Sequence, residues 1–525
     1  MRDDTRALHE ALKARLDTVA GVLGVDLPAG ASTVDTLDAL ARVVRETDDV
    51  RQIWLLHIGI TGIFPEPDDL ARLRRSLILA TPVTAFLKAL EGTIAAGSRS
   101  FSALRTMEVV QGEVFVDVDF CARWEHNTGI QRVVRHTVPE WQDDPAKAHR
   151  LVAWTSDYTA YLDLTDRQRD RVLHWNDRSF EKVVDPTVSN ESLEHAHILV
   201  PWNSAVLLAE VPTDGVCPEL ACLAQSSPNS VAAIGYDTIP LVSADGLPDA
   251  ESERFAHYLS VVKHVDVVAG ISESASDEFQ GFVDALPSQG LTGPRVTAVS
   301  LATEVSEIAR RAVEAVEKDP KESPIILSVG SHEPRKNQEA ALFAAELLFA
   351  EGLDFQIVFV GGGSRQATYR FDQKVARLKK AGMRVESHRK LGDEDLWSFF
   401  ARARFTVFPS LHEGFGLPVA ESLAFGTPAL TSDFGSLDEI ARLGGCVQID
   451  PRDDDQIVDG MRRLLTDDAL LARLHGEIAG QTQKTWKTYA DELWAATVAV
   501  LPTPETADGP PAPAARSRAT KKVNA

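Results

Sequence analysis

From Glu113 onward, short runs of β-branched and apolar residues alternate with amphipathic helical segments. The first set of runs is EVFVDVDF, RLVAWTS, HILVPW, SVAAIGYD, DVVAGIS and RVTAVSL. After an acidic helical segment that ends near Glu317, a second set begins with PIILSVGS and continues with FQIVFVGGGS, MRVESH, FTVFPS, TPALTSD and CVQID. Strands that alternate with helices are typical of βαβ units, which build parallel sheets. The pattern therefore predicts an α/β protein with two Rossmann-like parallel-sheet lobes that face a cleft, joined near residues 305–322.

The segment before the first lobe has a different pattern. Residues 1–108 carry helical spacing and few strand signals, which predicts a helical N-terminal extension that could be an oligomer or partner surface. Within it, TVDTLDALARVVRE predicts a helix that opens at Ser32 or Thr33. The apolar stripe expected on this helix consists of Val34, Leu37, Leu40 and Val43.

These patterns set the expected boundaries. We expect the first lobe at residues 109–304 and the second at 305–485. Residues 502–525 are rich in Pro and Ala and end with basic side chains, so a disordered tail is expected there. A contact between this tail and an anionic membrane surface stays open.

Composition narrows the classes of function. The 525-residue chain is 44% hydrophobic and 25% charged, as soluble globular proteins are. Its formal net charge of −23 argues against a nucleic-acid partner, because phosphate backbones require clustered Lys and Arg. The 4 cysteines are too few and scattered for a disulfide framework, and the charged start lacks the apolar core of a signal peptide. We therefore expect a cytoplasmic protein.

The stretch LHEGFGLPVAE, residues 411–421, lies between the strand FTVFPS and the helix LPVAESLAFG. Gly414 and Gly416 allow a close approach between backbone and ligand. The free N–H groups from about Gly416 to Val419, together with the helix dipole, form a candidate anion site. Glu421 follows in the first turns, where its carboxylate can accept hydrogen bonds from sugar hydroxyls. Alternatively, acidic residues at a helix start only stabilise that helix, by about 0.3–1 kcal/mol.

Two other stretches reach the same cleft. SVGSHEPRKNQEAAL places Arg335 and Lys336 at a strand end beside a helix start, which suits a diphosphate, although a solvated basic turn is the alternative. In WEHNTGIQRVVRH, Gly129 opens a helix of the first lobe and would let a ligand approach from across the cleft. Asn127 or Thr128 would cap this helix, and a capped start explains the glycine nearly as well. A capping box is also expected in SLDE, residues 436–439.

Together these motifs resemble the retaining glycosyltransferases of family four, which have the GT-B fold. The resemblance covers about residues 112–500, and its most specific part is FPSLHEGFGLPVAESLAFGTPALTSDFGSLDEIA. SVGSHEPRKN, YDTIP and DVVAGISESASDEF are similar to further blocks of the family. TWKTYADELWAATVAVL resembles its closing helix, so residues 486–501 are expected to return to the first lobe. TGIQRVVRH with EPRKN resembles a branch of cell-surface polysaccharide enzymes, many of which transfer mannose.

The resemblance implies a nucleoside-diphosphate sugar as donor and a glycan or lipid-linked hydroxyl as acceptor, with no metal or other cofactor. The acceptor would bind the first lobe and the donor the second. The transferred sugar would be held by Glu413 and the ribose by Glu421, and Leu391 would border the base. The residues implied to contact the diphosphate are Gly129, Arg335, Lys336, Gly414, Phe415, Gly416 and Leu417.

Two residues depart from the family pattern. Ser331 occupies a place where the family often has an arginine, and Tyr236 stands where many members have a histidine. Asp237 is then the first-lobe polar candidate near the reacting carbon, joining Glu413, Arg335 and Lys336 as the implied catalytic set; a turn or helix cap is its alternative role. Two other functions stay open. One is a nucleotide-sugar epimerase of the same fold, and the other is a non-catalytic nucleotide-sugar sensor or assembly scaffold.

Overall fold

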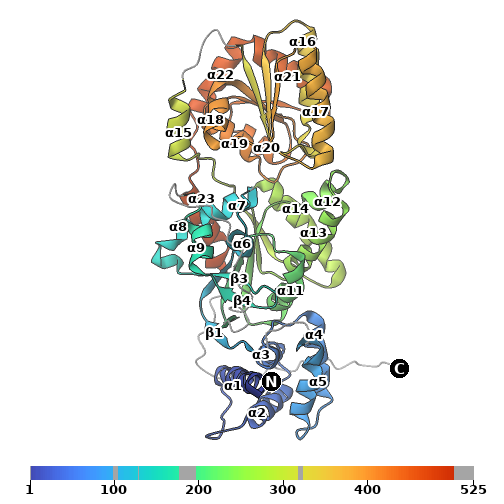
Figure 1. Ribbon diagram of the computed structural model, residues 1–525, viewed down its shortest axis with the longest axis vertical. Helices are drawn as coiled ribbons and strands as arrows, with labels where there is room; N and C mark the ends of the chain where they lie inside the picture. The colour runs from blue at the N-terminus through green and yellow to red at the C-terminus, as the bar shows by residue number, and fades with distance from the viewer. Residues whose placement is uncertain (1, 98–103, 128, 177–196, 317–322, 502–525) are drawn as a thin grey trace, which may run out of the picture.

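The computed structural model describes residues 2–97, 104–127, 129–176, 197–316 and 323–501. The N-terminal helices, the first lobe and the second lobe are stacked along the long axis of the molecule (Figure 1). The expected tail at 502–525, and Thr128 as a helix cap, lie outside the described residues. No helix in the described part of the chain is both long and apolar enough to span a membrane.

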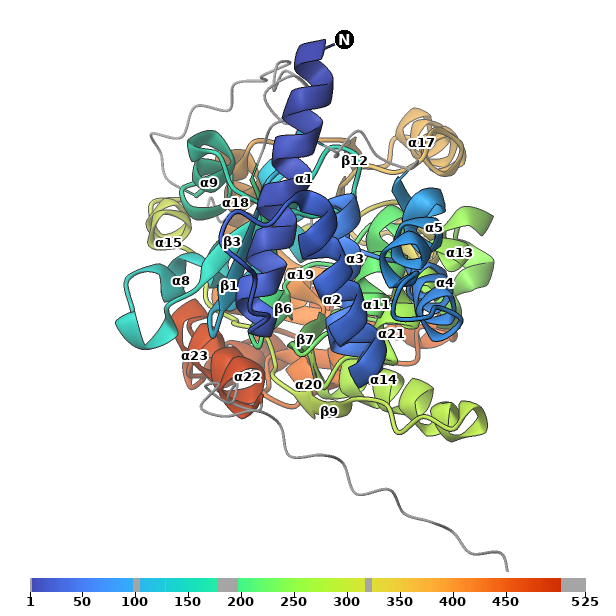
Figure 2. The same cartoon turned by 90° about the horizontal axis from the view of Figure 1, so that it is seen from below.

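The N-terminal extension is built from helices that share one hydrophobic core with the first lobe. They are α1 (Arg2–Leu23), α2 (Thr33–Thr47), α3 (Val50–Thr61), α4 (Pro67–Ile78) and α5 (Ala85–Gly97). Seen from below, these helices lie across the end of the first lobe, with α4 and α5 together on one side (Figure 2). The ring of Trp54 in α3 stacks on Trp202 at 6.4 Å, and Phe64 meets Tyr161 edge to face at 5.5 Å. The extension therefore completes the core of the first lobe.

Helix α2 begins as expected but presents a different stripe to the core. Ser32 and Asp35 form a capping box at its start. Leu37 and Leu40 are buried as predicted, whereas Val34 is 56% exposed and Val43 is half-buried. The other buried residues of α2 are Thr33, Thr36, Ala41 and Val44. Small side chains allow close packing between helices, and a stripe predicted from large apolar residues alone misses them.

The first lobe contains a nine-stranded sheet with the order β1-β5-β4-β3-β2-β6-β7-β8-β9. The strands are β1 (Met107–Gln111), β2 (Val114–Asp117), β3 (Arg150–Trp154), β4 (Tyr161–Asp163), β5 (Ile198–Trp202), β6 (Ala205–Leu208), β7 (Ser230–Gly235), β8 (Val267–Gly270) and β9 (Arg295–Ala298). Every neighbouring pair is parallel except the two that contain β4. Sequence patterns miss β1, β4 and β6, which are short, and β1 starts inside the range expected for the extension.

The described helices of the first lobe lie between its strands singly or in groups, whereas β2 follows β1, β4 follows β3 and β6 follows β5 directly. They are α6 (Asp119–Arg123), α7 (Gly129–Thr137), α8 (Pro139–Gln142), α9 (Asp166–Leu173), α11 (Cys217–Ser226), α12 (Ile239–Val242), α13 (Asp249–Val262) and α14 (Glu273–Ala285).

The second lobe contains a six-stranded sheet, parallel throughout, with the order β12-β11-β10-β13-β14-β15. The strands are β10 (Ile325–Val329), β11 (Gln356–Val360), β12 (Val385–His388), β13 (Ala403–Phe408), β14 (Ala429–Ser432) and β15 (Cys446–Ile449). The helices are α15 (Glu307–Glu314), α16 (Gln338–Ala350), α17 (Arg365–Lys380), α18 (Asp393–Arg402), α19 (Leu417–Ala424), α20 (Gly435–Ala441), α21 (Asp454–Thr466) and α22 (Asp468–Ala479). Such strands are covered on both faces, which explains their continuous apolar runs.

The chain then leaves the second lobe through α23 (Trp486–Ala496), which packs on the first lobe. The indole N–H of Trp141 donates to the carbonyl of Ala490 at 2.9 Å, and the ring of Trp486 stacks on His136 at 4.6 Å. Beside this crossing, the N–H groups of residues 303 and 304 both donate to the carbonyl of residue 484. The two lobes are thus joined by two adjacent segments of chain.

Candidate active site between the lobes

The centre of the candidate site is the loop between β13 and α19. Gly416 precedes α19 with a φ of 103°, a left-handed conformation that favours glycine. A Cβ at Gly416 would also lie 2.4 Å from Leu437. Backbone conformation and packing therefore both require a glycine here, and the predicted close approach of a ligand stays a prediction. Pro418 lies in the first turn and Gly426 follows the helix end with a φ of 80°, both as expected.

The start of α19 offers fewer donors than the sequence indicates. Pro418 has no N–H, and the N–H of Val419 donates to the carbonyl of Gly416 at 2.9 Å. Among the described residues, no hydrogen bond engages the N–H groups of Phe415, Gly416 or Leu417. The candidate anion site consequently narrows to these three backbone groups.

Next to this loop, the structure brings together three of the predicted catalytic side chains. Lys336 Nζ lies 2.6 Å from each carboxylate oxygen of Glu413, and Arg335 Nη1 lies 3.0 Å from Glu413 Oε2. All three side chains are largely buried. Burial pushes the pKa of Glu413 upward, but Lys336 and then Arg335 outweigh it and hold this pKa below its ordinary value. Glu413 is therefore an ionised carboxylate shared by two cations.

Backbone contacts hold the basic turn in place. Arg335 and Lys336 lie in a short 3-10 turn, and the N–H of Leu411 donates to the carbonyl of Arg335 at 2.6 Å. Arg335 also pairs with Glu333 through its Nε, at 2.9 Å. Ser331 Oγ donates to the other carboxylate oxygen of Glu333. The side chain of Ser331 thus stabilises the acid beside the turn that contains Arg335 and Lys336.

The first lobe meets the loop directly at Gly414. A Cβ there would lie 2.6 Å from the carbonyl oxygen of Tyr236 and 3.1 Å from Asp237 Oδ2. Gly414 is thus required by contact between the lobes, which differs from the ligand approach that the sequence predicts. Ser272 Oγ donates to the carbonyl of Gly414 at 2.7 Å, and His412 Nε2 lies 2.7 Å from Glu278. The lobes are closed on each other at the predicted site.

The two residues at the end of β7 have different roles. The Tyr236 hydroxyl donates to the carbonyl of Ala209 at 2.7 Å and points into the first-lobe core, so it offers no polar group to the cleft. Asp237 faces the loop, and its carboxylate accepts the N–H of Ile239 at 3.0 Å. Burial raises the pKa of Asp237, against the opposing effects of that hydrogen bond and of Arg335. Asp237 therefore stabilises the turn at Ile239 and also lies next to the loop that carries the predicted reacting groups.

Glu421 makes a contact that the sequence did not predict. Arg132 Nη2 of α7, in the first lobe, donates to Glu421 Oε1 across the cleft. Glu421 is the main reason why the pKa of Arg132 is raised. Arg132 lies three residues after Gly129 in the stretch already singled out, so a cation on the first turn of that helix was the available signal.

The other predicted residues lie at the edges of this cluster. A Cβ at Gly129 would find open space, and its φ is not positive, so neither packing nor backbone conformation requires a glycine there. Leu391 is half-buried against the apolar cluster that contains Val360 and Phe400. Asn127 accepts a hydrogen bond from Arg135 at 3.1 Å.

The capping box expected at residues 436–439 is wrong. Helix α20 begins at Gly435, so Ser436 lies inside its first turn and donates to the carbonyl of Glu413 at 2.8 Å. Glu439 reaches the first lobe, where it accepts the N–H groups of Glu273 at 2.9 Å and Ser274 at 2.7 Å, at the start of α14. Ser436 therefore fixes the backbone of the loop at Glu413, and Glu439 links the second lobe to the first.

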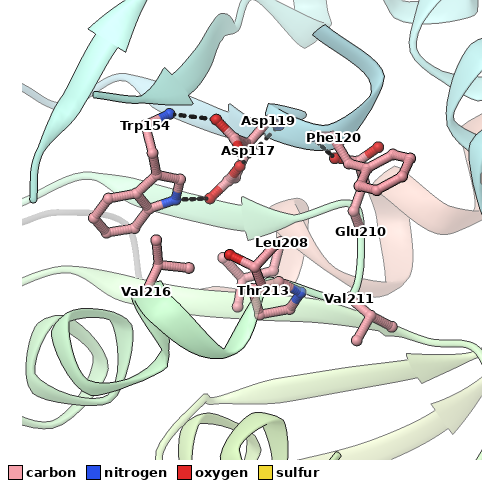
Figure 3. Close-up of a pocket in the computed structure, with 10 residues that line it drawn as sticks. Asp117, Asp119, Phe120, Trp154, Leu208, Glu210, Val211, Thr213 and Val216 are labelled. Carbon is pink, nitrogen blue, oxygen red and sulfur yellow. Dashed lines mark hydrogen bonds between the residues drawn. The ribbon is translucent and has the colours of Figure 1, made fainter. Parts of the chain in front are cut away.

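A small pocket lies in the first lobe at the carboxyl ends of β2, β3 and β6 (Figure 3). Asp117 accepts the indole N–H of Trp154 at 2.9 Å, and Glu210 accepts the N–H groups of Phe120 and Cys121. Burial raises the pKa of Asp117 and of Glu210 to about 7. These carboxylates anchor the start of α6 and line a pocket on the side where an acceptor is expected.

Comparison with known proteins finds similarities to described families and relatives. Residues 310–480 match the family described as Glycosyl transferases group 1. The serotype-specific mannosyltransferase WbdA of Escherichia coli is 29% identical over 275 residues, which cover 51% of this chain and 33% of that protein. The O-antigen chain mannosyltransferase B of Escherichia coli is 36% identical over 147 residues, which cover 27% of this chain and 37% of that protein. The chain thus spans about a third of the length of these relatives.

The fold also has a solved counterpart. The N-terminal domain of Candida albicans trehalose-6-phosphate phosphatase superposes with a TM-score of 0.51 and 10% identity, covering 74% of this chain and 97% of that domain. At this identity the likeness concerns the fold alone. Two parallel-sheet lobes closed on a cleft, with a C-terminal helix that returns to the first lobe, confirm the GT-B class expected from the sequence.

Proposed function

We propose that this chain, whose residues 310–480 belong to the group 1 glycosyl transferases, moves a sugar from a nucleoside-diphosphate sugar to an acceptor hydroxyl. The observation that carries the proposal is the cluster of Glu413, Arg335 and Lys336 beside the free N–H groups at the start of α19. It lies at the carboxyl end of the second-lobe sheet, where open α/β sheets bind ligands. Asp237 faces the loop that carries this cluster from the first lobe.

In the proposed reaction, the acceptor hydroxyl attacks the anomeric carbon from the side of the departing diphosphate, so the configuration is retained. The diphosphate oxygen takes the proton of the hydroxyl. Arg335, Lys336 and the N–H groups of residues 415–417 stabilise the negative charge that grows on the diphosphate. The proposed reaction uses no metal ion. Glu413 would accept hydrogen bonds from the transferred sugar and Glu421 from the ribose.

The contact between the lobes supports transfer of the sugar to an acceptor hydroxyl in preference to water. Gly414 touches the first lobe, and residues 272 and 278 bond the loop from the same side. A closed cleft of this kind excludes water and so suppresses hydrolysis of the donor. Neither an epimerase nor a sensor is favoured by a specific contact in the site.

The relatives suggest the finer assignment. Their names describe mannosyltransferases, one serotype-specific and one of the O-antigen chain. We therefore extend the proposal to a mannosyl donor, a glycan or lipid-linked acceptor, and a place in the synthesis of cell-surface polysaccharide. A cytoplasmic enzyme that works beside the inner face of the membrane, alone or as an oligomer through residues 1–108, fits such an acceptor.

The test is a thermal-shift screen of the purified chain against GDP, UDP, ADP and dTDP, with and without their common sugars. A micromolar ligand at millimolar concentration should add about 4 kcal/mol to the free energy of unfolding. The expected result is a shift with one nucleotide family, reduced in Glu421→Ala. Turnover of that donor should then require an acceptor, whereas an epimerase would consume donor alone. A protein that no nucleotide stabilises would contradict the proposal.

A further inference from the structure

The ion pair between Arg132 and Glu421 joins the two lobes at the donor side of the cleft, and nothing in the proposed reaction yet uses Arg132. We propose that Arg132 is a donor-binding residue, whose guanidinium contacts the diphosphate from the first lobe. The inference rests on the proposed function, which requires a diphosphate at the start of α19. In the free protein the same guanidinium rests on Glu421.

The position of the pair supports a contact with the diphosphate. Glu421 lies four residues after Leu417 in α19, which places it one turn along the same face of the helix. One turn advances about 5.4 Å, so a group bound to Glu421 lies within reach of an anion held by the free N–H of Leu417. Arg132 is therefore close to the diphosphate by the geometry of a single helix.

The guanidinium of Arg132 has N–H donors that its contact with Glu421 leaves unused. Its contact with Glu421 joins Nη2 to one carboxylate oxygen, and no other hydrogen bond of Arg132 is formed among the described residues. An arginine carries five N–H donors in a planar fork that matches phosphate geometry. The side chain is also 37% exposed, so a ligand in the cleft can reach it. Likewise, the second oxygen of Glu421 remains available for a hydroxyl.

The charges of the site explain why a further cation is needed. On the second lobe, Arg335 and Lys336 are balanced by Glu413 and Glu333, so this group of side chains has no net charge. Glu421 adds a carboxylate to the same side. A diphosphate would thus meet a set of side chains with net negative charge, were it not for Arg132. The first lobe therefore supplies the cation that the donor site lacks.

Placing this cation on the other lobe has a mechanical consequence. The N–H groups of α19 and the basic turn hold the diphosphate from the second lobe, and Arg132 completes the grip only when the lobes are closed. Donor affinity is then coupled to closure through one side chain.

The experiment is isothermal titration calorimetry of the full chain at fixed ionic strength with GDP, UDP, ADP and dTDP, and with the corresponding nucleosides. The variants are Arg132→Gln and Arg132→Lys. Arg442→Gln is the matched control, because Arg442 Nη1 also faces a first-lobe carboxylate, Glu273 Oε2 at 3.6 Å, and its side chain is 62% exposed. This control removes the same charge and a cross-lobe pair outside the donor site.

For the nucleotide that the unaltered protein binds, we expect Arg132→Gln to raise Kd about 10- to 100-fold, the usual scale for a lost charged hydrogen bond. Affinity for the matching nucleoside should stay within about threefold. Arg132→Lys should be intermediate, because it keeps the charge and loses the fork. Arg442→Gln should bind like the unaltered protein.

Three results would overturn the inference. Unchanged or tighter diphosphate binding by Arg132→Gln would show that Arg132 only competes with the donor for Glu421. An equal loss for the diphosphate and the nucleoside would place its effect on Glu421 or on the fold. An equal loss in Arg442→Gln would assign it to lobe association. If the unaltered protein binds none of the nucleotides, the proposed function itself fails and the inference with it.

Discussion

Gly414→Ala should open the cleft, because this glycine is the point where the second lobe touches the backbone of the first. The added Cβ would lie 2.6 Å from the carbonyl oxygen of Tyr236. An ordinary contact between carbon and oxygen is about 3.3 Å, so the lobes must separate by roughly 0.7 Å at this point. The obstacle is backbone, which cannot rotate away as a side chain can. The φ of Gly414 is not positive, so alanine adds no strain of its own at this position.

The size of the effect follows from the cost of overpacking. One extra methyl group in a well-packed contact typically costs 1–3 kcal/mol. This cost falls on the closed form alone, so the ratio of open to closed molecules should rise about 5- to 150-fold. The hydrogen bond from Ser272 Oγ to the carbonyl of Gly414 and the pair between His412 and Glu278 should weaken with it.

Small-angle X-ray scattering in the absence of ligand measures the change directly, as an increase in the radius of gyration. The matched control is Gly281→Ala in α14, where a Cβ would meet nothing within 4 Å. It should scatter like the unaltered protein. A Gly414→Ala variant with the same scattering profile as Gly281→Ala, and with the donor turnover of the unaltered protein, would refute closure of the lobes through this contact.

Three further outcomes are expected. Lys336→Ala should lower turnover at saturating donor by about 10²–10³, the scale for one lost donor to a developing anion, and nearly full turnover in a steady-state assay would exclude the role. The Glu413 ion pairs lower its pKa below 4.5, so their stabilisation is complete above that pH and is lost as the pH falls through the folded-state pKa. Urea unfolding of Glu413→Gln should therefore show a deficit at pH 7 that shrinks as the pH falls below the ordinary pKa of a glutamate, and a constant deficit would contradict the pairing. Trp141→Ala should cost about 3–5 kcal/mol in the free energy of unfolding, because the buried ring packs on α23 and bonds Ala490; a loss below 1 kcal/mol would show that α23 is not held there.

Local patterns were sufficient for most of the elements. The strand runs of the second lobe appear where the sequence predicts them, and Pro418 and Gly426 mark the start and end of α19. Strand β4 was missed because three residues are too few for a periodic pattern. The stripe of α2 was misplaced because the sequence does not show how closely α1 and α5 approach it.

The sequence predicted which residues form the candidate site, but it predicted their contacts less well. Glu413, Arg335 and Lys336 were selected from two separate motifs, and the parallel sheet brings them together at the ends of β10 and β13. The structure adds a packing requirement at Gly414 and Gly416 that the sequence did not predict, and the expected approach of a ligand to their backbone stays a prediction. A glycine has no side chain to indicate what lies beside it, so several causes produce the same sequence signal.

Periodicity and neighbours along the chain were enough to predict most of the strands and helices, the two lobes, and the charged residues at the strand ends. Only the tertiary structure decided which groups meet across the cleft. Arg132 reaches Glu421 over 289 residues of sequence, and Glu439 bonds the start of a helix in the other lobe. Such contacts depend on the angle at which the lobes close, and no local pattern encodes an angle between two separately folded sheets.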